Sequence, residues 1–286
     1  MLANGWINGF LGVLIFSGSL PATRAAVVGL DPLFVTVARG AVAGLLAAAL
    51  LLLFRQRRPA RGDIASLAIV ALGVVVGFPL LTGFALRSMT SAHSIVFIGL
   101  LPLVTALFGV LRGGERPQRA FWVFSGLGAA LVAGFALAQG GGGGSASGDL
   151  LMIAAIIVCG LGYAEGARLA RKLGGWQVIS WALVLALPLM LPLALAGLPA
   201  SFAAVDGSAW VGLAYVSLFS MLIGFIFWYR GLAQGGIAAV GQLQLLQPFF
   251  AFGLAAALLH EPVGWPMLLA SLGVVGCVAL AKRFAA

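Results

Sequence analysis

The stretch Ala85–Pro102 reads ALRSMTSAHSIVFIGLLP, and it aligns without a gap to Gly231–Pro248, which reads GLAQGGIAAVGQLQLLQP. Thirteen residues beyond each proline comes a glutamate, Glu115 in the first copy and Glu261 in the second. The chain therefore contains two related halves, and this duplication guides the interpretation of everything that surrounds it.

The sequence around these stretches is apolar almost throughout. Of its 286 residues, 62% are hydrophobic and 8% are charged, and the mean hydropathy is +1.14, whereas a soluble domain carries roughly 25% charged residues. A helix needs about 20 apolar residues to cross a bilayer, and the runs lack the alternating polarity of a membrane β-barrel. The sequence predicts an all-α integral membrane protein with ten transmembrane helices. The expected spans are 5–22, 33–54, 64–86, 93–111, 120–138, 149–167, 176–197, 208–229, 238–258 and 264–281.

Basic residues gather on one side of this predicted bundle. Thirteen of the sixteen Lys and Arg residues lie in the loops 55–63, 112–119, 168–175 and 230–236 and in the C-terminus. The opposite loops hold only Arg24 and Arg87, and Arg39 lies inside a span, from which its long side chain is expected to snorkel outward. Because cytoplasmic loops carry the excess of basic residues, both termini are predicted to be cytoplasmic. No continuous basic face is left for nucleic acid.

A Gly/Ser-rich segment, QGGGGGSASG at 139–148, divides the expected spans five and five. Its composition is that of a flexible coil, so we expect a periplasmic linker between a first repeat (1–138) and a second (149–286). An odd number of helices per repeat makes the second copy enter the membrane from the other side. The basic loop 112–119 indeed corresponds to 260–264, which has no Lys or Arg. Inverted repeats around a shared central cavity are a recurring transporter plan.

Two prolines occupy equivalent positions well inside the fourth and ninth spans. Pro102 and Pro248 lack an N–H group, so each is expected to bend its helix. They are candidate gating hinges, with a static kink as the alternative.

Polar side chains at lipid depth are the next candidates for substrate contacts. Their burial in the membrane costs free energy, so they usually face the protein interior. Gln244 and Gln247 are three residues apart and share a helix face. Their amides either bind the polar groups of a substrate or form a hydrogen bond to a neighbouring helix. An interhelical hydrogen bond of this kind contributes about 0.6 kcal/mol to stability. Ser17 either contacts substrate or donates to its own i−4 carbonyl.

Aromatic residues form the third group of candidates. Phe78, Phe97 and Tyr163 lie centrally, where they either stack on a flat organic substrate or pack against other helices. Trp228 and Tyr229 are close to the predicted cytoplasmic edge, which favours anchoring in the membrane interface.

Ionisable groups and reactive residues are few. His93 begins the fourth span, as a rim residue or as a proton carrier, and no span has a central Asp or Glu. Two cysteines and two histidines show no metal-binding or disulfide spacing. No reactive constellation is evident, so we expect no catalytic residues, metal or cofactor.

The whole pattern resembles the drug/metabolite transporter superfamily, and in particular the EamA-type bacterial inner-membrane exporters close to the aromatic amino acid branch. The resemblance covers nearly the whole chain, and it rests on ten spans in two inverted halves and on a repeated signature, Ala92, Pro102, Glu115 and Gly128 followed by Ala238, Pro248, Glu261 and Gly273.

This resemblance implies a basket-like bundle in the bacterial inner membrane, with a central cavity formed mainly by helices one, three, four, six, eight and nine. It also implies efflux of amino acids or similar amphipathic small molecules by alternating access. Two fused halves make a monomer sufficient, and coupling to protons and passive facilitation both stay open. The alternatives are a lipid or polyprenyl-glycan flippase subunit and, more remotely, an integral-membrane enzyme.

Overall fold

The computed structural model describes residues 2–113, 118–138, 145–235, 240 and 242–284. Regular structure in this part of the chain is entirely helical. The N-terminal half contains α1 (Leu2–Ser17), α2 (Ser19–Gly29), α3 (Pro32–Leu53), η1 (Arg61–Asp63), α4 (Ile64–Val70), η2 (Ala71–Gly77), α5 (Phe78–Ser88), α6 (Ser91–Ile98), α7 (Leu101–Gly113) and α8 (Arg119–Ala138). The C-terminal half contains α9 (Ala146–Leu173), α10 (Gly175–Ala196), α11 (Gly207–Tyr215), η3 (Val216–Ile223), α12 (Gly224–Gly235), η4 (Gln242–Leu246), α14 (Gln247–Leu259) and α15 (Trp265–Arg283).

Apolar helical segments of membrane-spanning length make up most of the bundle. Seven described segments are long and apolar enough to cross a bilayer: Asn4–Gly29, Pro32–Leu53, Arg61–Ser88, Ser91–Leu111, Ala146–Leu173, Gly175–Ala196 and Gly207–Gln234. Shorter apolar helices cover Arg119–Leu131, Gln247–Leu259 and Trp265–Cys277. Each expected span overlaps one of these segments. The all-helical membrane class is therefore confirmed, while the number of crossings stays a prediction.

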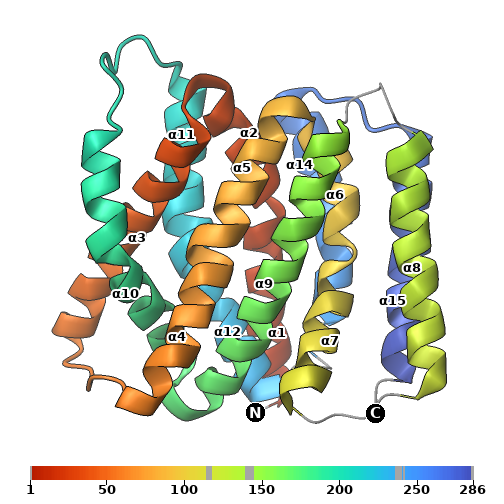
Figure 1. The fold of residues 1–286 in the computed structure, drawn as a ribbon, viewed down its shortest axis with the longest axis horizontal. Helices are drawn as coiled ribbons and strands as arrows, with labels where there is room; N and C mark the ends of the chain where they lie inside the picture. The colour runs from red at the N-terminus through yellow and green to blue at the C-terminus, as the bar shows by residue number, and fades with distance from the viewer. Residues whose placement is uncertain (1, 114–117, 139–144, 236–239, 241, 285–286) are drawn as a thin grey trace.

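The helices run side by side between two ends of the bundle (Figure 1). We call the end at which α1 begins and α15 finishes the terminus end, and the opposite one the far end. The α3–α4 and α9–α10 connections lie at the terminus end, whereas the α2–α3 and α5–α6 turns lie at the far end. The predicted grouping of basic loops agrees with this arrangement, because the loop after α3 carries Arg55, Arg57 and Arg58. Which end faces the cytoplasm stays a prediction.

Helices that begin at the far end are capped by short polar side chains. The Asp31 carboxylate accepts hydrogen bonds from the backbone N–H groups of Leu33 (2.9 Å) and Phe34 (3.3 Å) at the start of α3. Ser145 caps α9 in the same way, and Asp206 caps α11. The hydrogen bonds from Ser208 also lower the pKa of the exposed Asp206 carboxyl. These caps satisfy N–H groups that have no partner inside the helix.

Two long helices contain a π-helical stretch, which the sequence reasoning missed. The stretch η2 separates α4 from α5, and η3 separates α11 from α12. The two stretches occupy equivalent positions in the two halves. Equivalent residues such as Ala85 and Gly231 are 146 positions apart, and the same offset places residues 71–77 of η2 at 217–223, inside η3. Such irregular stretches often occur at functional sites.

The two prolines of the repeated signature follow short irregular stretches, in which tighter turns replace the α-helical hydrogen-bond pattern. Helix α6 ends at Ile98 and α7 begins at Leu101, so Pro102 lies in the first turn of a new helix. Pro248 likewise follows the 3₁₀ stretch η4 at the start of α14. A first-turn proline leaves no intrahelical hydrogen bond unmade. The expected bends are therefore real, but they take the form of interruptions just before the prolines, and a gating role stays a prediction.

Glycines allow the closest helix contacts. A Cβ atom on Gly73 of η2 would lie 2.6 Å from the carbonyl oxygen of Val158 and 3.0 Å from Cα of Gly162, both on α9. Small residues permit this kind of backbone approach between membrane helices. Gly73 therefore fixes the spacing of η2 and α9, both of which contribute to the cavity described next.

Candidate substrate cavity

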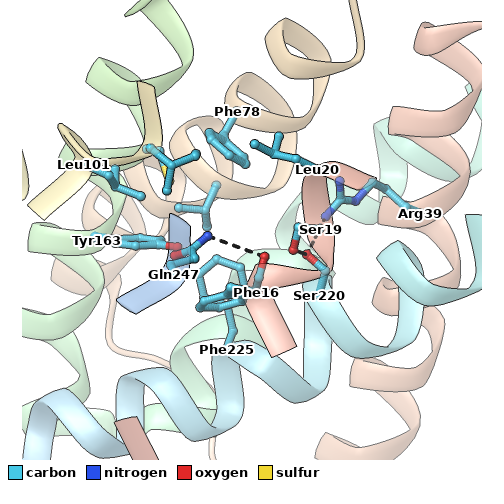
Figure 2. A pocket seen from close by; sticks show the side chains of 13 residues that line it. Phe16, Ser19, Leu20, Arg39, Phe78, Leu101, Tyr163, Ser220, Phe225 and Gln247 are labelled. Atoms are coloured by element: carbon cyan, nitrogen blue, oxygen red, sulfur yellow. Dashed lines mark hydrogen bonds between the residues drawn. The ribbon is translucent and has the colours of Figure 1, made fainter. Parts of the chain in front are cut away.

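A small cavity, with a volume of about 20 Å³, lies inside the bundle (Figure 2). It is bounded by the segments that were expected as spans one, three, four, six, eight and nine, and by α3 in addition. Its wall consists of Phe16, Ser19, Leu20, Arg39, Val74, Phe78, Ile98, Leu101, Cys159, Tyr163, Ser220, Phe225 and Gln247. Most of these side chains are aromatic or aliphatic, and a few polar groups converge among them. Such a mixture is typical of sites for small organic molecules.

Three of the predicted site residues line this cavity. Phe78 is half-buried on α5, Tyr163 is buried on α9, and Gln247 is buried at the start of α14. Pro102 and Pro248 each follow a wall residue directly, Leu101 and Gln247 respectively.

The other predicted residues lie outside the cavity wall. The Ser17 hydroxyl donates to the Val13 carbonyl oxygen at 2.8 Å, which is the intrahelical alternative considered for it. Phe97 is fully buried with its ring beside His93, the two centroids 5.9 Å apart. Gln244 is buried in η4. None of these three side chains lines the cavity in this arrangement, and their contact with a substrate stays a prediction.

Arg39 was missed as a site residue, and the expectation that it snorkels outward is wrong. Its side chain turns inward and is only 3% exposed. Nη2 donates to the Ser220 hydroxyl oxygen at 3.2 Å, and the hydroxyl oxygens of Ser220 and Ser19 are 2.7 Å apart. Figure 2 shows this chain of three side chains at one side of the cavity. An arginine within an apolar run is itself a functional signal, but its position near a helix end made the direction of the side chain ambiguous.

Gln247 presents an acceptor to the cavity. Its Nε2 donates to the Phe16 carbonyl oxygen at 3.4 Å. Because a carbonyl oxygen only accepts, this contact fixes which end of the amide is nitrogen. Oε1 has no hydrogen-bond partner within the described part of the chain.

Four aromatic rings pack against one another beside the cavity. We call Phe16, Tyr163, Phe225 and Trp228 the aromatic cluster. Ring centroids are 5.0 Å apart for Phe16 and Phe225, and 5.8 Å apart both for Tyr163 and Phe225 and for Tyr163 and Trp228. Helix α12, which carries Phe225 and Trp228, runs from η3 toward the terminus end (Figure 1).

Trp228 and Tyr229 do not anchor the protein in the membrane interface. Trp228 is 1% exposed and Tyr229 is fully buried, so the expectation of interface anchoring is wrong. Small residues on neighbouring helices pack against both. A Cβ on Gly12 would lie 3.1 Å from the Trp228 backbone, and the Tyr229 hydroxyl donates to the Gly162 carbonyl oxygen at 3.2 Å.

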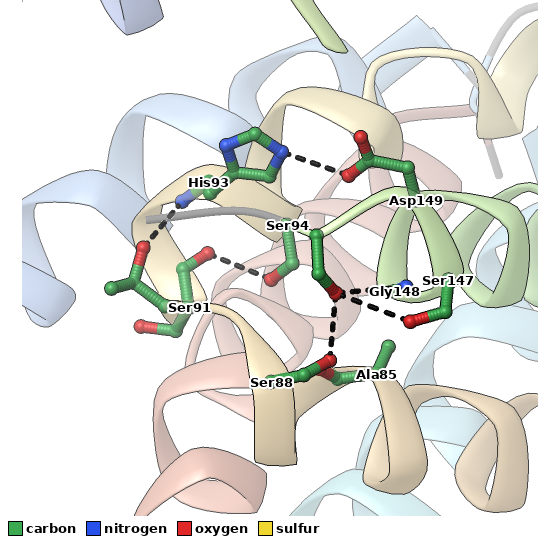
Figure 3. A network of polar contacts seen from close by, with 10 residues as sticks. Ala85, Ser88, Ser91, His93, Ser94, Ser147, Gly148 and Asp149 are labelled. Carbon is green, nitrogen blue, oxygen red and sulfur yellow. Dashed lines mark hydrogen bonds and ion pairs between the residues drawn. The ribbon is translucent and has the colours of Figure 1, made fainter. Parts of the chain in front are cut away.

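A polar network closes the far end (Figure 3). His93 Nε2 lies 2.9 Å from an Asp149 carboxylate oxygen, which joins α6 to α9. The Ser145 hydroxyl donates to Ser88 Oγ at 3.0 Å, which joins the start of α9 to the end of α5. His93 thus lies in the first turn of α6 at the far end, where the start of the fourth span was expected, and its side chain is fully buried.

Glu261 links the two halves at this end. Its carboxylate accepts from the Ser91 N–H (3.1 Å), the Ser91 hydroxyl (2.6 Å) and the Ala92 N–H (2.8 Å). The Thr90 hydroxyl oxygen accepts from the next N–H, that of His93. A negative charge at a helix N-terminus is favourable, so Glu261 holds the beginning of α6 against the loop after α14. The signature glutamate of the first half, Glu115, lies outside the described residues.

Replacing Glu261 with glutamine is expected to loosen the far end. The variant loses the charge that strengthens three hydrogen bonds, and charge-assisted bonds contribute about 1.5–3 kcal/mol each. Cys159 lines the cavity and is the sole cysteine once Cys277 is replaced by serine. A membrane-impermeant thiol reagent applied to the far-end side should label it about tenfold faster than in the parent. Asp206→Asn is the control, because Asp206 caps α11 without joining the halves. Equal labelling in all three proteins would exclude this role of Glu261.

An all-helical membrane bundle that encloses a cavity of mixed polar and aromatic character is typical of membrane transporters. The chain belongs to the EamA-like transporter family, within the drug/metabolite transporter superfamily, and the family matches it twice, over residues 3–137 and 146–282.

Relatives of this family cover nearly the whole chain. The uncharacterized transporter YdeK of Bacillus subtilis (strain 168) is 68% identical over 99% of this chain and 98% of its own length. A probable terminal-alkyne amino-acid exporter of Streptantibioticus cattleyicolor is 23% identical over 96% of this chain and 92% of its own. A known crystal structure shares the fold with a TM-score of 0.69 at 20% identity, and the match covers 97% of each chain.

Proposed function

We propose that this transporter exports small amphipathic metabolites, in particular aromatic or other amino acids, across the bacterial inner membrane by alternating access. The observation that carries the proposal is the cavity, in which aromatic rings and a buried arginine face the same space. The name of the Streptantibioticus cattleyicolor relative, an amino-acid exporter, supports the substrate class. Cytoplasmic termini, as the basic loops predict, would place the terminus end inside the cell.

Within this proposal the chain consists of two inverted repeats, 1–138 and 149–286, joined by the linker 139–148. The double family match supports the division. Packing supports it as well, because α3 packs on α10 and α8 packs on α15, which pairs the second and the fifth helix of each half with its counterpart. The cavity wall contains matched residues 146 or 147 positions apart, namely Phe16 with Tyr163, Val74 with Ser220, Phe78 with Phe225 and Leu101 with Gln247.

Alternating access then requires that each end open in turn. The aromatic cluster closes the terminus end, while Glu261 and the His93–Asp149 pair close the far end. The helix breaks before Pro102 and Pro248 are the proposed hinges, because they interrupt the two segments that carry Leu101 and Gln247. We propose Phe78, Tyr163 and Gln247 as substrate contacts and leave Ser17, Phe97 and Gln244 out of that set.

Replacing Gln247 with leucine should slow export about tenfold, because the cavity loses polar groups of the kind that discriminate between substrates. The assay follows accumulation of labelled L-tryptophan, L-threonine and a cationic dye in bacterial cells that express the protein. Gln244→Leu is the matched control, since Gln244 is buried beside the same helix but outside the cavity wall. Equal rates in the two variants would remove Gln247 from the site. A lipid or polyprenyl-glycan flippase would leave all three compounds unaffected.

A further inference from the structure

Arg39 is a buried cation that has no anionic partner among the residues that the structure describes. Within the described residues, no carboxylate oxygen lies within 4.0 Å of its guanidinium. The six described acidic side chains have contacts elsewhere: Asp31 with Arg87, Asp63 with Lys172, Asp149 with His93, Glu165 with Arg168, Asp206 with Ser208 and Glu261 with Ser91. A charged side chain at lipid depth is costly and usually faces a functional cavity. The positive charge of Arg39 is therefore available to a ligand.

The groups beside Arg39 are also donors. Its Nε has no hydrogen-bond partner among the described residues, although its atoms are buried. The Ser19 and Ser220 hydroxyls carry two protons between them and share one hydrogen bond. One hydroxyl proton is thus left to donate. A guanidinium with a hydroxyl donor next to it matches the two oxygens of a carboxylate, which arginine binds in a bidentate manner.

The remaining wall complements this donor set. Gln247 offers the acceptor Oε1, which has no partner in the described part of the chain and suits an ammonium group. Phe16, Tyr163 and Phe225 present rings, with the Phe16 and Tyr163 planes at 25° to each other and their centroids 6.4 Å apart. An apolar or aromatic α-amino acid carries one group for each of these three parts of the cavity.

We propose that Arg39, Ser19 and Ser220 form an anion subsite that takes the carboxylate of the transported compound, so that the substrate class is apolar or aromatic carboxylates, α-amino acids among them. The assignment rests on the proposed function for its place in transport. The subsite itself is testable by binding alone.

Equilibrium dialysis against the purified protein in lipid nanodiscs separates the chemical groups. Three labelled probes share an indole ring: L-tryptophan has both charges, indole-3-propionate has only the carboxylate, and tryptamine has only the ammonium. The parent should bind the two acids more tightly than tryptamine. Arg39→Gln should weaken binding of both acids about tenfold to a hundredfold, as expected for loss of a charge-assisted contact, and should leave tryptamine unchanged. Arg39→Lys should recover part of the loss.

Two further variants keep the outcome decisive. Arg87→Gln removes a positive charge at the far end, where the Arg87 side chain is 57% exposed, and should bind all three probes like the parent. Ser220→Ala should weaken the two acids only. The subsite is wrong if Arg39→Gln binds the acids as tightly as the parent, if it loses all three probes equally while still folded, or if the parent binds neither acid. Selective acid binding without export of any compound would instead overturn the proposed function and leave the subsite in place.

Discussion

Replacing Gly73 with leucine should abolish the folded protein. The new side chain would enter the contact between η2 and α9, where even a Cβ lies 2.6 Å from the Val158 carbonyl oxygen. Backbone atoms cannot move aside as a flexible side chain can, so the helices must separate. We expect destabilisation of at least about 3 kcal/mol, the upper part of the usual range for overpacked cores. Size-exclusion chromatography of the detergent-extracted protein should show loss of the monodisperse peak.

Gly253 provides the matched control. It lies exposed on α14, and among the described residues no atom comes within 4 Å of the position that a Cβ would occupy there. Gly253→Leu therefore adds the same side chain on an apolar helix without a clash, and should keep the parent elution profile. Normal extraction and elution of Gly73→Leu would show that η2 and α9 do not need their close contact.

Removing the Trp228 ring should open the terminus end. Trp228 is 1% exposed and completes the aromatic cluster, and deletion of a buried tryptophan side chain costs about 3–5 kcal/mol. Part of this loss falls on the closed arrangement, in which the ring fills the space between the cavity and the terminus end. In Trp228→Ala, Cys159 should be labelled roughly tenfold faster by an impermeant thiol reagent applied at the terminus end, with Cys277 replaced by serine throughout.

The direction of access separates this effect from general loosening. Labelling from the far end should stay at the parent rate, whereas Glu261→Gln should show the reverse pattern. Trp265→Ala is the control, because Trp265 is 77% exposed and does not belong to the cluster. If Trp228→Ala speeds labelling equally from both ends, the cluster supports the fold and does not close one side.

The membrane class and the helix pattern were predictable from sequence because lipid imposes a simple rule on composition. Apolar runs must be helical where no water is present to satisfy the backbone, so the apolar helical segments followed from hydropathy, while the sides of their loops stay a prediction. The interruptions near Pro102 and Pro248 were predictable as bends, because proline lacks the N–H group that continues a helix. The π stretches η2 and η3 were not predictable, since neither contains a residue type that marks them.

Side-chain direction limited prediction of the cavity. Gln247 and Gln244 share a face in a regular α-helix, but η4 interposes a 3₁₀ stretch, and only Gln247 reaches the cavity wall. Trp228 resembled an interface anchor because of its position along the span, whereas its ring packs against Phe16 and Tyr163 inside the bundle. Arg39 illustrates the same limit, since sequence gives the depth of a charge and not the direction in which it points.

The paired π stretches also bear on the history of the chain. A π turn holds one residue more than an α turn, so each records an extra residue within a helix. If the halves descend from one ancestor, matched positions of η2 and η3 place that insertion before the gene duplicated. In that case the ancestral polypeptide already possessed this widened turn.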